Sequence, residues 1–207
     1  IILHEKVFEV NTSLMCYNTQ TMSRICIIIS GRSGAGKTTF IKEAVLSDVL
    51  NIEYMTSYVT RPPRNNDYGY VYLTKNEYNA RRNSSTMWDH FEIYDEYYGT
   101  DIGELVEKVK NGKNILISCY PTIAELQKIA KSYPVPTKSI FIDISEELSL
   151  KKIREERQGH EIERVEFENK IITRETLNAF DYIFTPEENL EVDVTKFIDL
   201  LKNIINK

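Results

Sequence analysis

GRSGAGKT, residues 31–38, is the most informative motif of this chain. It matches the pattern G-x-x-x-x-G-K-[ST] at every fixed position. Glycine adopts backbone angles closed to other residues, so such a loop can wrap an anion and point its N–H groups at it. We therefore predict a phosphate-binding loop, or P-loop. In it, Lys37 reaches the β- and γ-phosphates of a nucleotide and Thr38 offers its hydroxyl to Mg²⁺.

The segments on either side of the P-loop give the context that this motif requires. Residues 25–29, ICIII, form a short apolar run rich in β-branched residues, typical of a strand buried on both faces of a parallel sheet. Apolar residues at helical spacing then predict a helix to about Asp48, with its N-terminus directed at the phosphates. The predicted ATP-binding residues are Gly31, Ser33, Gly34, Ala35, Gly36, Lys37, Thr38 and Thr39.

The rest of the chain continues the alternation of strands and helices. We predict strands at 114–119, 138–144 and 181–185, each followed by a helix, at 121–132, 146–156 and 190–205. This alternation indicates an α/β fold with a parallel sheet flanked by helices.

Three stretches depart from this rhythm. Residues 53–100 are rich in Tyr, Thr and Arg and predict a small antiparallel inset. Residues 157–166 are almost all polar, and we interpret them as a mobile segment over the site or as an exposed loop. Residues 1–21 lack a clear pattern. They are interpreted as a tail or an added leader before one domain at 22–207.

Composition narrows the class of protein. The chain has 207 residues and a formal net charge of −5, which suits one α/β domain and disfavours a general nucleic-acid binder. Its three cysteines include no C-x-x-C pair, so we expect a reducing, cytoplasmic location. No run of 18 apolar residues predicts a membrane span.

A second phosphate site is indicated by TRPPR, residues 60–64. Arg61 and Arg64 stand three residues apart on a segment stiffened by proline, and guanidinium groups bind phosphate with two hydrogen bonds. Two such groups predict a clamp for the phosphate of an acceptor. A basic surface turn is the alternative interpretation.

Taken together, these segments resemble guanylate kinase, a nucleoside monophosphate kinase family among the P-loop kinases. The resemblance runs from about Arg24 to Ile205. Its matching pieces are SGAGKTT at 33–39, Ser57 with TRPPR at 60–64, YVY at 70–72 leading to NEY at 76–78, DEYYGT at 95–100 and FDYI at 180–183.

The resemblance implies an activity and a set of residues. The implied reaction is Mg²⁺-assisted phosphorylation of GMP or dGMP by ATP, in a monomer or dimer without nucleic-acid or membrane partners. The inset would bind the nucleoside monophosphate, and a helical lid would span about 150–170. The implied substrate-binding residues are Ser57, Arg61, Arg64, Tyr70, Asp89, Tyr98 and Thr100. The implied catalytic residues are Lys37, Arg154 and Arg157, with Thr38 at the metal.

Some positions depart from the family pattern. Residues 118–120 read SCY where the family places Asp-x-Asp. Ile171 stands where a further lid arginine is expected, with Arg164 and Arg174 nearby, and Thr185 precedes Pro186 where the family has an Asn. Two alternatives therefore remain. One is a related P-loop kinase with another acceptor, such as a different nucleotide or a sugar phosphate. The other is a non-catalytic module that binds protein partners.

Overall fold

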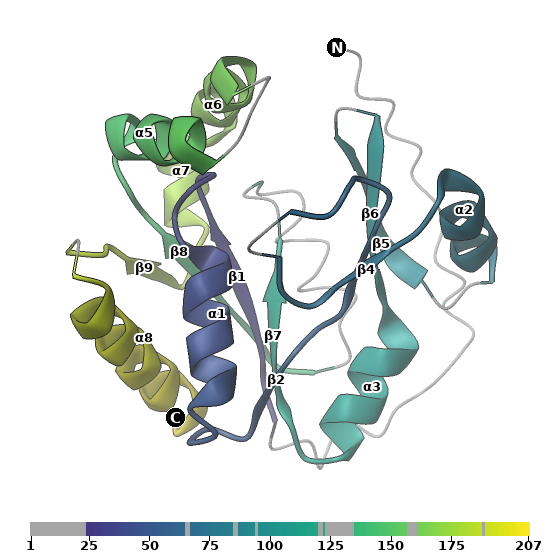
Figure 1. The fold of residues 1–207 in the computed structure, drawn as a ribbon. Coiled ribbons are helices and arrows are strands. Elements are labelled where there is room, and N and C mark those ends of the chain that lie inside the picture. Colours follow the sequence, from purple (N-terminus) through teal and green to yellow (C-terminus); the bar gives the residue numbers. More distant parts are fainter. Residues whose placement is uncertain are drawn as a thin grey trace.

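The computed structural model describes residues 24–64, 67–84, 87–93, 95–119, 122, 135–156, 161–187 and 189–207. These residues form two sheets with helices packed around them (Figure 1). The predicted tail at 1–21 and nearly all of the predicted helix at 121–132 lie outside the described residues.

The larger sheet has five strands, and every strand pair in it is parallel. Its order is β2-β7-β1-β8-β9, so the strand before the P-loop lies at the centre. All six residues of this strand are buried, because it is covered on both faces. The predicted parallel α/β sheet is thus confirmed. The strands are β1 (Cys26–Gly31), β2 (Ile52–Tyr54), β7 (Asn114–Ser118), β8 (Thr137–Ile142) and β9 (Tyr182–Phe184).

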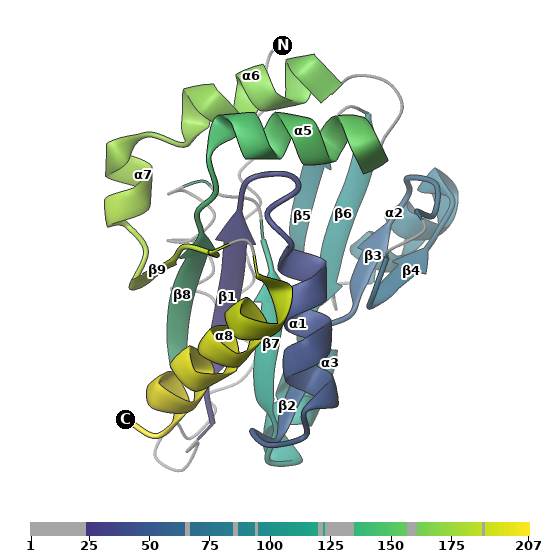
Figure 2. The ribbon, with the colours of Figure 1, turned by 60° about the vertical axis from the view of Figure 1, so that its left-hand side comes forward.

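Two helices, α1 (Lys37–Leu46) and α8 (Leu190–Ile205), cover one face of this sheet (Figure 2). They meet around the rings of Phe40, Phe184 and Phe197, whose centroids lie 5.2–5.4 Å apart. The bounds of α8 are those predicted. Packing of this kind fixes α1 against β1 and so fixes the loop between them.

The opposite face is covered by α3 (Ile102–Lys110), a helix that was not predicted from the sequence. Its buried residues Leu105 and Val109 pack with Ile28 and Phe141 of the central strands. A short helix, α7 (Arg174–Asn178), leads into β9. Both faces of the sheet are therefore closed by apolar contacts.

The smaller sheet has the order β4-β3-β6-β5, and α2 (Lys75–Asn83) packs beside it. The pairs β3–β6 and β5–β6 are antiparallel, as predicted for the inset, whereas β3 and β4 pair in parallel. Residues 53–54, predicted as part of the inset, belong to β2 at the edge of the larger sheet. The strands are β3 (Ser57–Val59), β4 (Tyr70–Tyr72), β5 (Met87–Ile93) and β6 (Glu96–Asp101).

One prediction was wrong in the region after α5 (Glu146–Glu156), a helix whose bounds were predicted correctly. Residues 161–166, predicted as part of a loop, form the beginning of α6 (Glu161–Ile171), which packs on α5. The first part of α6 is polar, but its buried positions Val165 and Glu168 lie three residues apart, and the buried Ile172 just beyond its end continues this face. The physical reason for the error is that one of these buried positions is charged, so hydrophobic periodicity missed it.

Candidate active site

The P-loop lies at the carboxyl end of β1, beneath α5 (Figure 2). Gly34 and Gly36 have φ values of 75° and 80°, in the left-handed region that favours glycine. At Gly31, a side chain would place its Cβ 2.5 Å from the carbonyl oxygen of Ile142. The two glycines that the motif requires are therefore explained by crowding at Gly31 and by conformation at Gly36, and Gly34 shares that conformation.

Lys37 begins α1 and bends back over the P-loop. Its Nζ donates hydrogen bonds to the carbonyl oxygens of Gly31 and Arg32, at 2.7 and 2.8 Å. Gly36, at the N-cap, has no side chain to accept from the first N–H groups of the helix, and the first turn has no acidic residue. The loop thus combines an ammonium group with the positive end of a helix, the arrangement that binds phosphate.

Two helices outside the motif hold the first half of the P-loop. From α5, Ser149 Oγ donates to the carbonyl of Ser33 at 2.7 Å. From α6, both carboxylate oxygens of Glu168 accept from Ser33: one from its N–H at 2.9 Å, the other from its hydroxyl. Arg32 Nη1 donates to Asn169 Oδ1 beside them. Glu168 was not predicted as a site residue. Its position three residues after Val165, on the buried face of α6, could have indicated a buried contact.

The carboxyl end of β7 connects the P-loop with the inset. Ser118 pairs with Ile29 in the parallel ladder, and the Cys119 N–H donates to Ile29. Tyr54, at the end of β2, pairs with Leu116 of β7, and its burial raises its pKa well above the usual value. Tyr54 was missed because the sequence placed it in the inset instead of in β2.

Arg61 is buried and paired. Its Nη1 and Nη2 donate to the two carboxylate oxygens of Asp67 at 2.7 and 2.8 Å, and the guanidinium lies 4.7 Å from the centroid of the Tyr70 ring. Burial alone would lower the pKa of Arg61, but the hydrogen bond and charge of Asp67 outweigh it, so the pKa is raised. Burial likewise opposes ionisation of Asp67, yet its hydrogen bonds from Arg61 and Tyr72 leave its pKa below the usual value.

The other predicted acceptor-phosphate residues lie around Arg61. Tyr70 contacts Arg61 through its ring, and Tyr98 of β6 lies opposite Val59 of β3, two residues before Arg61. The backbone N–H of Arg64 donates to Asp67, and its side chain is exposed. Asp67 itself was not predicted. Its position three residues after Arg64, within a short turn, was the only local signal.

The predicted base-reading residues occupy one row across the smaller sheet. Ser57 of β3 lies opposite Tyr70 of β4 on one side and opposite Thr100 of β6 on the other. Thr100 in turn lies opposite the backbone of Asp89 in β5. Residues directly opposite in a sheet share a face, and Ser57 and Thr100 are buried there. The side chain of Asp89 lies outside the described residues.

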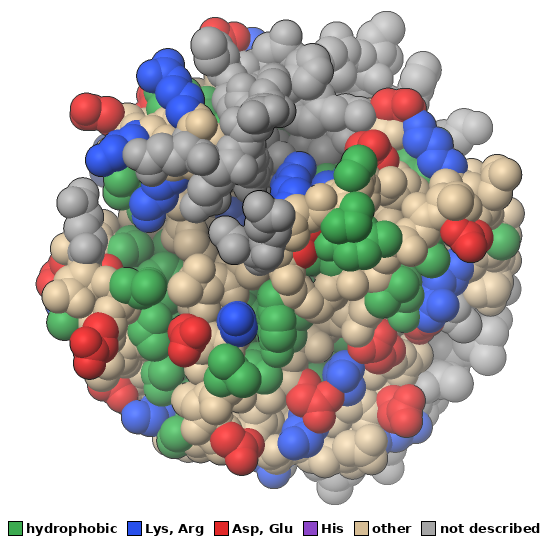
Figure 3. Space-filling view, viewed as in Figure 1, with side chains coloured by type: hydrophobic (Ala, Val, Ile, Leu, Met, Phe, Trp, Pro, Cys, Tyr) green, Lys and Arg blue, Asp and Glu red, His purple; other side chains and the backbone are tan. Residues whose placement is uncertain are grey.

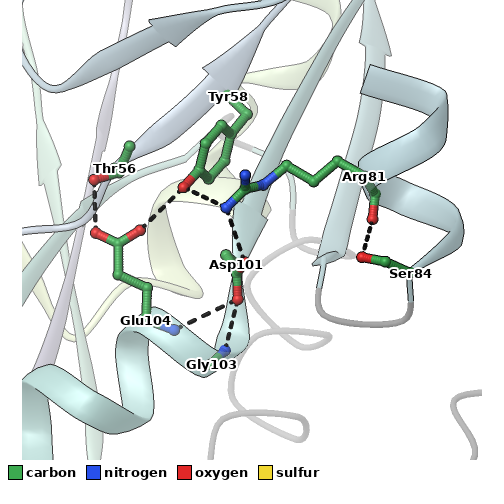
Figure 4. A network of polar contacts seen from close by, with 7 residues as sticks. All are labelled: Thr56, Tyr58, Arg81, Ser84, Asp101, Gly103 and Glu104. Carbon is green, nitrogen blue, oxygen red and sulfur yellow. Dashed lines mark hydrogen bonds and ion pairs between the residues drawn. The ribbon is translucent and has the colours of Figure 1, made fainter. Parts of the chain in front are cut away.

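Tyr58 belongs to the other face of β3 and holds that strand from behind (Figure 4). Its ring lies 3.9 Å from the guanidinium carbon of Arg81 in α2, which also donates to the Tyr58 hydroxyl at 2.7 Å and to Asp101 at 3.1 Å. Glu104 of α3 accepts from Thr56 at 2.6 Å. This network connects β3 to α2 and α3. It therefore supports β3 on the face of the sheet opposite to Ser57 and Thr100.

The predicted lid arginines are only partly described. Arg154 is exposed in the last turn of α5, and Arg157 lies outside the described residues. Ile171 is half-buried, and Arg174 is exposed at the beginning of α7. Figure 3 shows Lys and Arg side chains between the α5–α6 side and the inset.

Among the described side chains, a hydroxyl is the candidate ligand for a metal ion. Within the described ranges, no group of three or more His, Cys, Asp and Glu lies close enough to hold a metal ion. A hydroxyl such as that of Thr38, in the first turn of α1, still fits Mg²⁺, which is commonly held by substrate phosphates and water with one or two protein groups. Among the helices of the described residues, none is long and apolar enough to cross a membrane.

Comparison with known proteins agrees with this geometry. Residues 23–206 match the family model described as guanylate kinase. The chain is 31% identical over 123 residues to a guanylate kinase of Clostridium acetobutylicum, an alignment covering 58% of this chain and 56% of that protein. A guanylate kinase of Malacoplasma penetrans is 28% identical over 190 residues, covering 86% of this chain and 91% of that one.

A solved structure shares the fold. The guanylate kinase of Anaplasma phagocytophilum superposes with a TM-score of 0.65 at 19% identity, covering 89% of this chain and 87% of that one. At this identity the likeness concerns the fold alone. It includes the parallel sheet and helices that position the P-loop.

Proposed function

Because this chain belongs to the guanylate kinase family, we propose that it transfers the γ-phosphoryl group of ATP to GMP or dGMP. The transfer takes place in the cytoplasm, within one domain at residues 22–207. The observation that supports this proposal most strongly is the joint placement of two anion-binding groups. The P-loop with Lys37 follows β1, and Arg61 follows β3 of the inset; β7 pairs with both β1 and β2, and β2 leads directly into β3.

The P-loop residues Gly31–Thr39 hold ATP. Backbone N–H groups at the beginning of α1 donate to its phosphates, and Lys37 moves its ammonium from the loop carbonyls to the β- and γ-phosphates. The Thr38 hydroxyl helps to hold Mg²⁺, which, when bound, neutralises charge on the phosphate oxygens.

The inset holds the acceptor. Arg61 and Arg64 donate to its phosphate, and the hydroxyls of Tyr70 and Tyr98 complete that contact. Arg61 is already oriented, because Asp67 and the Tyr70 ring fix its guanidinium. A preoriented donor loses less entropy on binding than a mobile one.

Base recognition falls to the row formed by Ser57, Thr100 and Asp89. Ser57 and Thr100 offer hydroxyls to the base, and the Asp89 carboxylate accepts from the guanine N1–H and 2-amino groups. Ser118 supplies a hydroxyl at the end of β7, next to the P-loop strand. Buried polar groups that pair with guanine reject a base that leaves them unpaired.

Transfer itself needs alignment and positive charge more than proton chemistry. The acceptor oxygen is already anionic, so no general base is required. Lys37 stabilises the migrating group from the P-loop side, and Arg154 and Arg157 approach from the lid. Closure of the inset and lid over the substrates excludes water and limits hydrolysis of ATP.

The proposal is tested by measuring ADP release from ATP and Mg²⁺ with GMP, dGMP, AMP, CMP, UMP and dTMP supplied separately. We expect rapid release only with guanine nucleotides, with adenine disfavoured by roughly 10⁴-fold in kcat/KM. Equal rates with several bases would contradict recognition by Ser57, Thr100 and Asp89. Binding of ATP without turnover of any nucleotide would favour a kinase with another acceptor, and absence of ATP binding would favour a non-catalytic module.

A further inference from the structure

Glu168 is a buried carboxylate that contacts the P-loop from outside the motif. It is 2% exposed, and it approaches Ser33 from α6 across 135 residues of chain. Its Oε2 accepts from the Ser33 N–H at 2.9 Å, and its Oε1 accepts from the Ser33 hydroxyl. One backbone donor of an anion-binding loop is thus directed at a carboxylate of the protein.

Burial of this carboxylate is costly unless donors satisfy it. Ser33 supplies two of them, one from its backbone and one from its side chain, and is itself 2% exposed. A paired contact of this kind fixes both the backbone position and the side-chain rotamer of Ser33. The residue after it is Gly34, whose left-handed conformation begins the turn toward Lys37.

The same part of the P-loop is held from α5. Ser149, completely buried, donates through Oγ to the carbonyl of Ser33. A Cβ on Gly34 would lie 3.1 Å from the Cβ of Lys152, so the loop packs closely on that helix. Residues 32–34 are therefore held on both sides, while Lys37 and the beginning of α1 face the phosphate position.

From this arrangement we infer that Glu168 is a positioning residue for ATP: it holds Ser33 so that the second half of the P-loop keeps its anion-binding shape. It also links the P-loop to the α5–α6 pair, and α5 carries Arg154. The inference rests on the proposed binding of ATP at the P-loop. Glu168 acts through Ser33 and makes no contact with substrate.

The test compares Glu168→Ala with Glu168→Gln in the full chain. Glutamine keeps the shape, and its amide can accept from the Ser33 N–H and donate to the Ser33 hydroxyl. We expect Glu168→Ala to weaken ATP binding roughly 10-fold or more, measured by titration calorimetry without acceptor, and Glu168→Gln to restore most of it. Glu166→Ala, at an exposed position of α6, serves as the matched control and should bind ATP as the unmodified protein does.

Steady-state kinetics give a second readout. The KM for ATP should rise in Glu168→Ala while the KM for GMP stays within about twofold, because Glu168 contacts the P-loop and not the inset. Equal rises in both constants, or a failure of glutamine to restore binding, would show a general structural role and overturn the inference. Tighter ATP binding in both variants would also overturn it, because Glu168 would then only repel phosphate.

Loss of folding must be distinguished from loss of ATP binding, so thermal unfolding is measured for each variant. If Glu168→Ala does not fold, Ser33→Ala takes its place. It removes one of the two hydrogen bonds to Glu168 and should weaken ATP binding by a smaller factor. Unchanged ATP binding in folded Ser33→Ala would then contradict the inference. Because binding is measured without acceptor, a protein that binds ATP but does not phosphorylate GMP would refute the proposed function alone.

Discussion

The P-loop and the inset each direct an anion-binding group at a carboxylate of the protein, but they do so differently. At the P-loop, Glu168 comes from a distant helix, is buried, and contacts a backbone N–H that lies deep in the loop. In the inset, Asp67 lies six residues from Arg61 and contacts the guanidinium that is proposed to bind phosphate. The first contact joins two parts of the fold, whereas the second shapes a single turn. A carboxylate therefore serves tertiary positioning at the P-loop and local preorganisation in the inset.

The largest expected effect comes from removing the ammonium group of the P-loop. Lys37→Ala should lower kcat by roughly 10²-fold or more, because a preorganised charge beside the migrating phosphoryl group is lost. Lys42→Ala, an exposed lysine on the same helix, is the matched control and should retain activity. Near-normal turnover in folded Lys37→Ala would show that the P-loop is not the site that binds the phosphoryl donor.

The second effect separates the two sites by substrate. Arg64→Ala should raise the KM for GMP on the order of 10-fold and leave the KM for ATP nearly unchanged, because the exposed side chain belongs to the inset. Steady-state kinetics with each substrate varied in turn give both constants. Equal rises in the two constants would show that Arg64 does not act on the acceptor alone.

The smallest effect concerns stability and its dependence on pH. Asp67→Asn should destabilise the protein by roughly 1–2 kcal/mol at pH 7, since the charged partner of Arg61 is lost. Folding lowers the pKa of Asp67 from the usual 3.8, so its stabilisation is present above that value and disappears as pH falls through the folded-state pKa. Thermal unfolding should therefore show a clear difference between variant and unmodified protein at pH 7 and a smaller one near pH 3.

A matched control and a kinetic readout complete that experiment. Asp199→Asn removes an exposed carboxylate that pairs with Lys202 on α8, and should change stability little at either pH. The KM for ATP should not change in Asp67→Asn, in contrast to Glu168→Ala. A difference between Asp67→Asn and the unmodified protein that does not shrink at low pH would show that the carboxylate charge is not what stabilises the turn.

Features that depend on neighbouring residues were predicted from the sequence, and features that depend on contacts between distant residues were not. The P-loop occupies eight consecutive residues, and its glycines have the conformations and close contacts that the motif requires. The helices α5 and α8 have apolar faces and clear ends, so their bounds were predicted correctly. Features of this kind are determined by residues close together in the sequence, so they can be predicted without knowledge of tertiary contacts.

The features that sequence missed depend on contacts between distant segments. Glu168 is a charged residue of α6, and its burial follows from its contact with Ser33, 135 positions away in the chain. Tyr54 ends a three-residue strand, and its place in the larger sheet follows from pairing with Leu116, 62 positions away by their numbers. Neither hydrophobic periodicity nor a motif encodes such pairings.

The predicted residues of the inset lie between these cases. Arg61, Tyr70 and Tyr98 come from three separate segments, which pairing in the smaller sheet brings together. The resemblance to a family indicated them, while the pairing of Arg61 with Asp67 was not foreseen. Their roles toward an acceptor remain a proposal that kinetics must test.

The most direct test of the account follows the transferred group itself. The protein is incubated with Mg²⁺, GMP and ATP labelled at its γ-phosphate, and the nucleotides are separated by chromatography. The account predicts that the label appears in GDP, with one GDP formed for each ADP, and that Lys37→Ala abolishes both products. Label found only in inorganic phosphate, with GMP unchanged, would contradict transfer between the P-loop and the inset.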